Sequence, residues 1–157
     1  MDSFLHKTAV SIRDIVYTEV SFLGDLDESV LSERRNSQGR NIKELLGHLI
    51  DSASNNHQRM VRLQYNEELI FPDYTSHNDV WIATQHYSDA PWKELVELWK
   101  YYNLHIARII GSADPEKAEN YWLDSQGEKV TLGYMADIYL YHLKLHVDQI
   151  HELAEKK

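Results

Sequence analysis

The stretch VTLGYMADIYLYHLKLHVDQI, residues 130–150, decides the fold that the sequence predicts. Its apolar positions recur at steps of three and four residues, the spacing of an amphipathic helix, and Thr131 belongs to the residue types that cap helix N-termini. The face expected to point inward comprises Met135, Ile138, Tyr139, His142, Leu145, His146, Gln149, Ile150 and Leu153. The sequence therefore predicts a long final helix with one face packed against other helices.

Three earlier segments show the same helical periodicity. Residues 4–23 form the first, and residues 42–60 form the second, which Asn41 can cap at its N-terminus. The third follows Ser88 and Asp89, which we expect to act as its caps. Four amphipathic helices without a competing parallel-strand pattern predict an all-α fold, an antiparallel four-helix bundle.

The connections between these helices are predicted to differ in length. Residues 65–87 lack a clear period, and we expect a long loop between helices two and three with one or two short helical turns. The run ENYWLDSQGEKVTL, residues 119–132, predicts a small hairpin around a Ser-Gln-Gly turn before the last helix. With 157 residues, the chain fits one domain spanning residues 1–157.

Composition excludes several classes of function. The formal net charge is −9 and the 16 basic residues are interspersed among 25 acidic ones, which argues against a nucleic-acid partner. The chain has no cysteine, so thiolate metal sites and a cysteine nucleophile are excluded. No apolar run is long enough to span a membrane and no secretory leader is recognisable, so we expect a cytoplasmic location.

A pair of histidines on the last helix is the strongest chemical feature. His142 and His146 are four residues apart and project about 40° from one another, so one metal ion can reach both imidazoles. A pair of neutral nitrogen ligands usually needs a third. His48, at the margin of the second helix's apolar face, is the natural candidate if the two helices pack antiparallel. The sequence thus points to a metal site at His48, His142 and His146.

The simplest alternative is that these are ordinary buried histidines with hydrogen-bond partners. Among the other histidines, His57 and His151 each lie nine residues after a proposed ligand, on the opposite side of an ideal helix, and we expect them to face solvent. The three remaining candidates, His77, His86 and His105, are expected to be exposed or structural.

Polar residues close to the proposed ligands are candidates for orienting them. Asp51 and Ser52 follow His48 by about one helical turn, and Gln149 follows His146 by three residues. Metal-ligating histidines commonly donate their second ring N–H to such a group. An equally good interpretation is that these three are ordinary polar residues on the outer side of a helix.

The sequence resembles the DinB-like superfamily of helical bundles over nearly its whole length. The resemblance rests on NIKELLGHLIDSASNN, residues 41–56, followed far downstream by the stretch quoted first. In this superfamily a histidine of the second helix and a His-x-x-x-His pair of the fourth bind one metal ion. The matching positions here are His48, His142 and His146, all present.

The resemblance also implies a metal and a group of reactions. Members of the superfamily commonly hold zinc or nickel, and some transfer a low-molecular-weight thiol, such as bacillithiol, mycothiol or glutathione, to a small-molecule electrophile. Three neutral imidazoles leave the metal its full positive charge, which lowers the pKa of a bound water or thiol. A metal-dependent thiol S-transferase is therefore the first hypothesis, and a metal-dependent hydrolase is its nearest competitor.

A non-catalytic function is the alternative of a different class. A bundle stabilised by metal can act through dimerisation or partner binding, and a metal closed off by four protein ligands would favour this reading. In that case Trp81, Trp92 and Trp122 would mark an exposed surface. A homodimer is expected because related bundles often pair through their helices.

Overall fold

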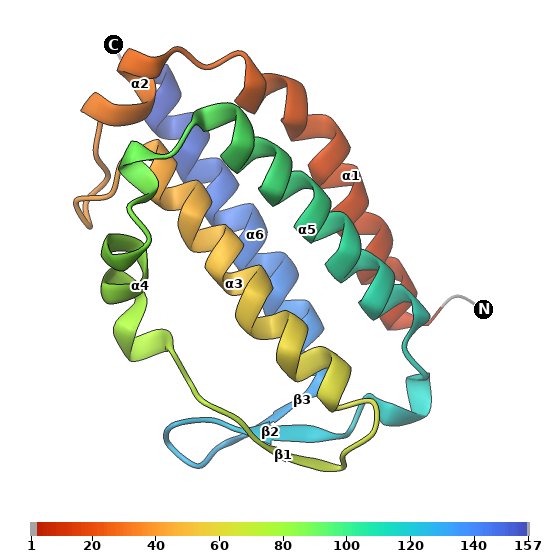
Figure 1. The fold of residues 1–157 in the computed structure, drawn as a ribbon. Coiled ribbons are helices and arrows are strands. Elements are labelled where there is room, and N and C mark those ends of the chain that lie inside the picture. Colours follow the sequence, from red (N-terminus) through yellow and green to blue (C-terminus); the bar gives the residue numbers. More distant parts are fainter. Residues whose placement is uncertain (1–2, 157) are drawn as a thin grey trace.

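Four long helices lie side by side in the computed structural model, which describes residues 3–156 (Figure 1). They are α1 (Phe4–Gly24), α3 (Ile42–Arg62), α5 (Trp92–Ser112) and α6 (Leu132–Glu155). The predicted all-α four-helix bundle, with a long connection between its second and third long helices and a hairpin before the last, is confirmed.

Shorter elements connect the long helices. They are α2 (Glu28–Glu33), β1 (Glu68–Ile70), the 3-10 turn η1 (Thr75–His77), α4 (Asn78–Thr84), η2 (Tyr87–Asp89), η3 (Pro115–Lys117), β2 (Tyr121–Leu123) and β3 (Lys129–Thr131). The sequence reading did not foresee α2 or β1. Both are too short to show a hydrophobic period, and each is held by its contacts with the bundle or with another strand.

The long connection fixes the directions of the helices. It carries the chain from the end of α3 back along the bundle through β1 and α4, so that α3 and α5 begin at the same end of the molecule (Figure 1). Lys43 near the start of α3 donates to the carbonyl of Ala90, just before α5. As a result α3 contacts α5 on one side and the antiparallel helix α6 on the other, while α1 contacts α5 and α6.

A small sheet covers the far end of the bundle. Strands β2 and β3 form the predicted antiparallel hairpin, with Trp122 opposite Val130. Gly127 in its turn has φ 77°, a conformation that glycine adopts without strain. Strand β1 adds to the hairpin in parallel, with Leu69 opposite Trp122. The sheet thereby joins the long connection to the segment that leads into α6.

The N-terminus of α3 is capped as predicted, whereas that of α5 is not. Asn41 accepts a hydrogen bond from the Glu44 backbone N–H at 2.9 Å, and the Glu44 carboxylate accepts one from the Asn41 N–H, also at 2.9 Å. This capping box confirms the cap predicted for α3. The predicted caps of α5 are wrong, because Ser88 and Asp89 lie in η2 and Pro91 precedes the helix. Ser88 instead donates to Glu44.

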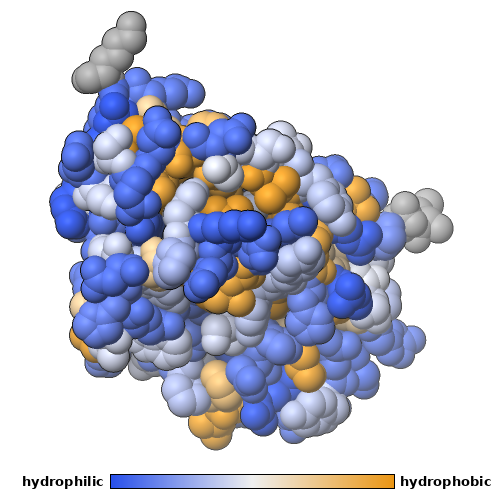
Figure 2. Space-filling model, turned by 45° about the horizontal axis from the view of Figure 1, so that its top comes forward, coloured by the Kyte–Doolittle hydropathy of each residue, from blue (hydrophilic) through white to orange (hydrophobic). Residues whose placement is uncertain are grey.

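The core is formed by the facing sides of the four long helices. Fully buried members from these helices include Ile12, Leu23, Leu46, Leu49, Trp99, Ile106, Ile110 and Ile150. The outer face seen in Figure 2 is mainly hydrophilic, with a smaller apolar area in its upper part. Trp92 and Trp122 are buried, so the expectation that they mark an exposed surface is wrong.

Some residues of α6 that were predicted to face inward are exposed. Ile138 and Leu145 are exposed, and so are Tyr134 and Tyr141 on the same helix. The apolar face of α6 is broad, so the sequence does not specify which part of that face packs against the neighbouring helices. The expected homodimer stays a prediction. No helix within residues 3–156 is apolar over a length that would cross a membrane.

Gly47 on α3 provides a test of this packing. A Cβ atom at this position would collide with the ring of Tyr87. We expect Gly47→Ala to lower the free energy of unfolding by about 1–3 kcal/mol, because the ring must move out of a close-packed site. Gly24→Ala is the matched control, since nothing lies within 4 Å of a Cβ there. Urea unfolding of both variants measures the difference; equal stabilities would contradict the proposed contact.

Candidate metal centre

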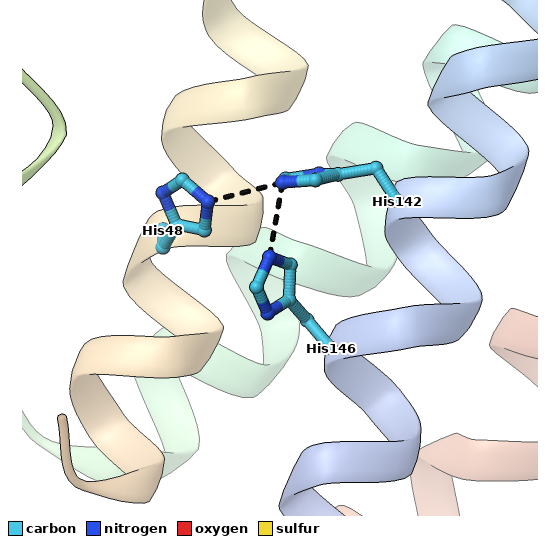
Figure 3. Close-up of side chains that lie close together, drawn as sticks. All are labelled: His48, His142 and His146. Atoms are coloured by element: carbon cyan, nitrogen blue, oxygen red, sulfur yellow. Dashed lines mark hydrogen bonds between the residues drawn. The ribbon is translucent and has the colours of Figure 1, made fainter. Parts of the chain in front are cut away.

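Three histidines from two helices converge between α3 and α6 (Figure 3). The Nε2 atom of His142 lies 3.0 Å from Nε2 of His48 and 3.0 Å from Nε2 of His146. The three rings meet edge to face, with centroids 4.4 to 4.9 Å apart. The structure thus brings together all three residues that the sequence singled out.

The helices position these side chains in a simple way. His142 and His146 lie one turn apart on α6, so their side chains leave the helix on the same face. His48 faces them from α3 because α3 packs antiparallel to α6. His48 and His146 are buried and His142 is nearly so. The cluster is therefore held by packing instead of by a mobile loop.

A hydrogen bond sets the protonation of one imidazole. Nδ1 of His146 lies 2.9 Å from Oε1 of Gln149, an acceptor, so Nδ1 carries the hydrogen and Nε2 keeps a free lone pair. This contact confirms the expected orienting role of Gln149. Asp51 and Ser52 have other partners than an imidazole: Asp51 accepts from the Tyr87 hydroxyl at 2.6 Å, and the Ser52 hydroxyl oxygen accepts from the Asn56 amide at 3.3 Å.

Burial keeps the cluster uncharged. It lowers the pKa of His48 from 6.5 to about 3, with further lowering from the neighbouring imidazoles and from Arg40. It lowers the pKa of His142 to about 4, again mainly by desolvation. The pKa of His146 is also lowered by burial, while its bond to Gln149 opposes the change. All three imidazoles are thus neutral near pH 7 and available as ligands.

The arrangement fits a metal ion better than a purely hydrogen-bonded cluster. One hydrogen on His142 Nε2 can be shared with only one of its two neighbours, so a further nitrogen lone pair stays unmatched. Two nitrogens on one tetrahedral zinc ion lie about 3.3 Å apart, close to the spacing seen here. A cation would match every converging Nε2 atom at once.

The other histidines lie outside the cluster. His57 and His151 are half-buried, so the expectation that they face solvent is wrong. Nδ1 of His57 lies 2.9 Å from the Tyr102 hydroxyl, and His151 contacts Glu19 at 2.6 Å. A helix opposite each histidine supplies these partners, which helical geometry alone does not reveal. The exposed positions of His77, His86 and His105 match the expectation.

A pocket of about 330 Å³ adjoins the cluster. His48 and His142 form one end of its wall, and residues of α3, α6, η1 and the sheet complete it. The lining also includes Ser52, Asn56, Arg59, Asp73, Tyr74, Asn78, Trp122, Asp124 and Tyr139. This volume admits a small molecule beside the imidazoles.

The sequence reading missed the pocket residues Arg59 and Trp122. Arg59 follows His48 by eleven residues, which places it about 20° away around the helix and therefore on the same face. That spacing could have identified Arg59 as a residue on the same helix face as His48. Trp122 gave no such signal, because it reaches the pocket from a strand of the small sheet.

The lowered histidine pKa values predict how stability depends on pH. The unfolded imidazoles take up protons near pH 6.5, whereas folded His48 and His142 do so only near pH 3 and 4. Between these limits the unfolded chain binds more protons, so the stability that is present above pH 6.5 is lost as the pH falls toward 4. The loss approaches about 1.4 kcal/mol per group and pH unit.

Urea unfolding of chelator-treated protein at pH 7.5, 6 and 5 measures this dependence. The double variant His48→Gln and His142→Gln, which lacks two of the titrating groups, should lose less stability over the same range. Parallel curves for the two proteins would contradict the assignment of buried neutral imidazoles.

Comparisons with known proteins identify the family. The family model described as the DinB superfamily matches residues 20–150. A solved structure with a similar fold is YfiT from Bacillus subtilis, described as a probable metal-dependent hydrolase with an unusual four-helix bundle topology; the TM-score is 0.82 at 17% identity, over 95% of this chain and 85% of that one. No curated protein matches the sequence. The chain belongs to the DinB superfamily.

Proposed function

We propose that this protein is a metal-dependent enzyme that uses one divalent cation held by His48, His142 and His146. The observation that carries the proposal is the convergence of three neutral Nε2 atoms beside a pocket. Three protein ligands with space next to them are typical of catalytic sites, whereas structural sites are closed by a fourth protein ligand. The adjoining pocket therefore favours catalysis over the non-catalytic bundle.

The ligand set suits zinc or nickel. Imidazole nitrogens are borderline ligands that bind both ions, and no thiolate is available in a chain without cysteine. When bound, such a cation supplies Lewis acidity, which lowers the pKa of a coordinated water or thiol toward neutrality. The protein's own residues hold the site, exclude water and position the reactants.

The first candidate reaction is the transfer of a low-molecular-weight thiol to a small-molecule electrophile. The chain has no cysteine, so a sulfur nucleophile must come from solution. The thiol gives its proton to solvent, its sulfur forms a bond to carbon, and the leaving group departs with the electron pair of the bond that breaks. A thiolate needs no base at the moment of attack. This suits a pocket whose carboxylates, Asp73 and Asp124, already accept hydrogen bonds from nearby turns.

The walls of the pocket support reaction with a small organic molecule. The rings of Tyr74, Trp122 and Tyr139 are buried and line it, so a bound reactant would be largely screened from water. The hydroxyl of Tyr139 is engaged with Asn103 at 2.7 Å, which fixes that ring. Gln149 holds His146 in the form with a free Nε2. These residues position and shield the reactants.

Hydrolysis is the second candidate reaction. It is supported by the likeness of the fold to YfiT, itself described as a probable metal-dependent hydrolase. The same three imidazoles can serve a water nucleophile. The difference between the candidates lies in the nucleophile, so a direct comparison of substrates separates them.

Metal content tests the ligand set. Protein purified without an affinity tag should carry about one equivalent of zinc or nickel, and each of His48→Ala, His142→Ala and His146→Ala should lose most of it, because two imidazoles hold an ion much less firmly than three. His57→Ala, on the same helix as His48 but outside the cluster, is the control and should keep its metal. Elemental analysis with circular dichroism as a folding check decides; full retention in all three variants would refute the assignment.

Substrate comparison tests the reaction. Metal-loaded protein should speed the reaction of bacillithiol, mycothiol or glutathione with 1-chloro-2,4-dinitrobenzene, releasing chloride, and His142→Ala should reduce the rate at least about tenfold. Chelator should have the same effect, and added metal should restore the rate. Activity only on nitrophenyl esters or anilides, independent of thiol, would replace the transferase with the hydrolase.

A further inference from the structure

Arg59 is a buried cation without a matching anion. Its side chain is 4% exposed, and its Nε and Nη1 atoms have no hydrogen-bond partner within residues 3–156. The third nitrogen, Nη2, makes a long contact of 3.4 Å with the Asn56 side chain. A buried charge with free donors costs folding free energy, so its retention calls for an explanation.

Neighbouring groups hold Arg59 in place but offset the burial of its charge only in part. Burial lowers the pKa of Arg59, and the nearby Tyr74 and Asp73 oppose this change without cancelling it. Its guanidinium lies 4.1 Å from the centre of the Trp122 ring. Asp73 and Asp124 line the same pocket, but Asp73 accepts from Thr75 and Ser125, and Asp124 accepts from the hairpin turn. No ion pair links either carboxylate to Arg59 in the part of the chain that the structure describes.

A second residue of the pocket wall also carries an unmatched polar atom. The Oδ1 atom of Asn78, at the start of α4, is buried and lacks a partner among the described residues. It is an acceptor, whereas the free atoms of Arg59 are donors. The pocket therefore offers one charged donor group and one neutral acceptor, a pattern that matches a ligand with an acidic group and an N–H.

Arg59 lies at a defined distance from the histidines. Arg59 lies eleven positions after His48, which corresponds to a rise of about 16 Å along α3, and the arginine side chain tilts back toward the helix N-terminus. The charge and the imidazoles are thus separated by a distance on the order of 10 Å within one pocket. A molecule of moderate length can reach both ends.

We propose that Arg59 binds a carboxylate of the substrate and so orients its reactive group toward His48, His142 and His146, an inference that rests on the proposed function. A carboxylate fits better than a phosphate, because Asp73 and Asp124 at the same pocket would repel a second negative charge. The planar guanidinium matches a carboxylate with two parallel hydrogen bonds. Asn78 accepts an N–H of the same molecule.

Matched pairs of probes test the charge requirement. Calorimetric titration compares S-methylglutathione with its diethyl ester, and hippurate with hippuramide, on chelator-treated and on zinc-loaded protein. The first pair represents the thiol cosubstrate and the second an electrophile or hydrolysed substrate. Neither S-methylglutathione nor hippurate offers a free thiol to a metal. We expect the carboxylate member of at least one pair to bind about tenfold more tightly or better.

Variants assign the preference to Arg59. Arg59→Met keeps an apolar stem against Trp122 and should abolish the preference for the carboxylate. Arg59→Lys keeps the charge in case the methionine variant does not fold, and it should retain a weakened preference. Arg62→Met is the matched control, because Arg62 lies on the same helix near Phe71 and outside this pocket. It should bind like the wild type.

Each result has a definite meaning. A preference in only one pair identifies which reactant carries the carboxylate. Equal binding within both pairs, absence of binding by all probes, or a preference that survives in Arg59→Met would overturn the proposal. Metal analysis of the same samples separates the two proposals. A carboxylate preference in a protein without metal would support the role of Arg59 and refute the proposed function. Bound metal without a carboxylate preference would support the proposed function and refute the role of Arg59.

Discussion

The antiparallel packing of α3 against α6 is the contact on which the site depends. Each helix alone supplies an incomplete ligand set, one imidazole from α3 and two from α6. The apolar faces that bury Leu49 and Ile150 hold the two helices close enough for the Nε2 atoms to meet at 3.0 Å. The energy that assembles the cluster therefore comes from ordinary hydrophobic burial, and the imidazoles need contribute little to it.

The long connection between α3 and α5 serves this packing in two ways. It returns the chain to the starting end of α3, which leaves α3 in contact with both α5 and α6. It also supplies Tyr87, whose ring lies against Gly47 and whose hydroxyl donates to the buried Asp51. Farther along α3, residues of η1, α4 and the sheet form the wall of the pocket. The connection between α3 and α5 thus packs against α3 next to His48 and also contributes to the wall of the pocket.

Half of the buried polar side-chain atoms that lack a partner within residues 3–156 belong to residues of one pocket, and the others belong to Arg40, Asp51, Arg62 and Trp99. Nδ1 of His48, Nε and Nη1 of Arg59, and Oδ1 of Asn78 are buried without partners in the described chain, and all three residues line the pocket. Folding alone would favour apolar residues at such positions. Their presence beside a neutral three-histidine cluster is the pattern expected where a protein gives up some stability to bind a ligand.

The sequence by itself determined what is local: four helical periods, the Asn41 cap, the hairpin, and the one-turn spacing of His142 and His146. These follow from backbone geometry over a few residues. Only the tertiary structure decided that His48 completes the cluster, that Ser88 serves α3 instead of α5, that His57 and His151 find partners, and that Arg59 and Trp122 share the pocket. Such contacts join residues far apart in the chain, and a helical period fixes which face is apolar but not which helix it will meet.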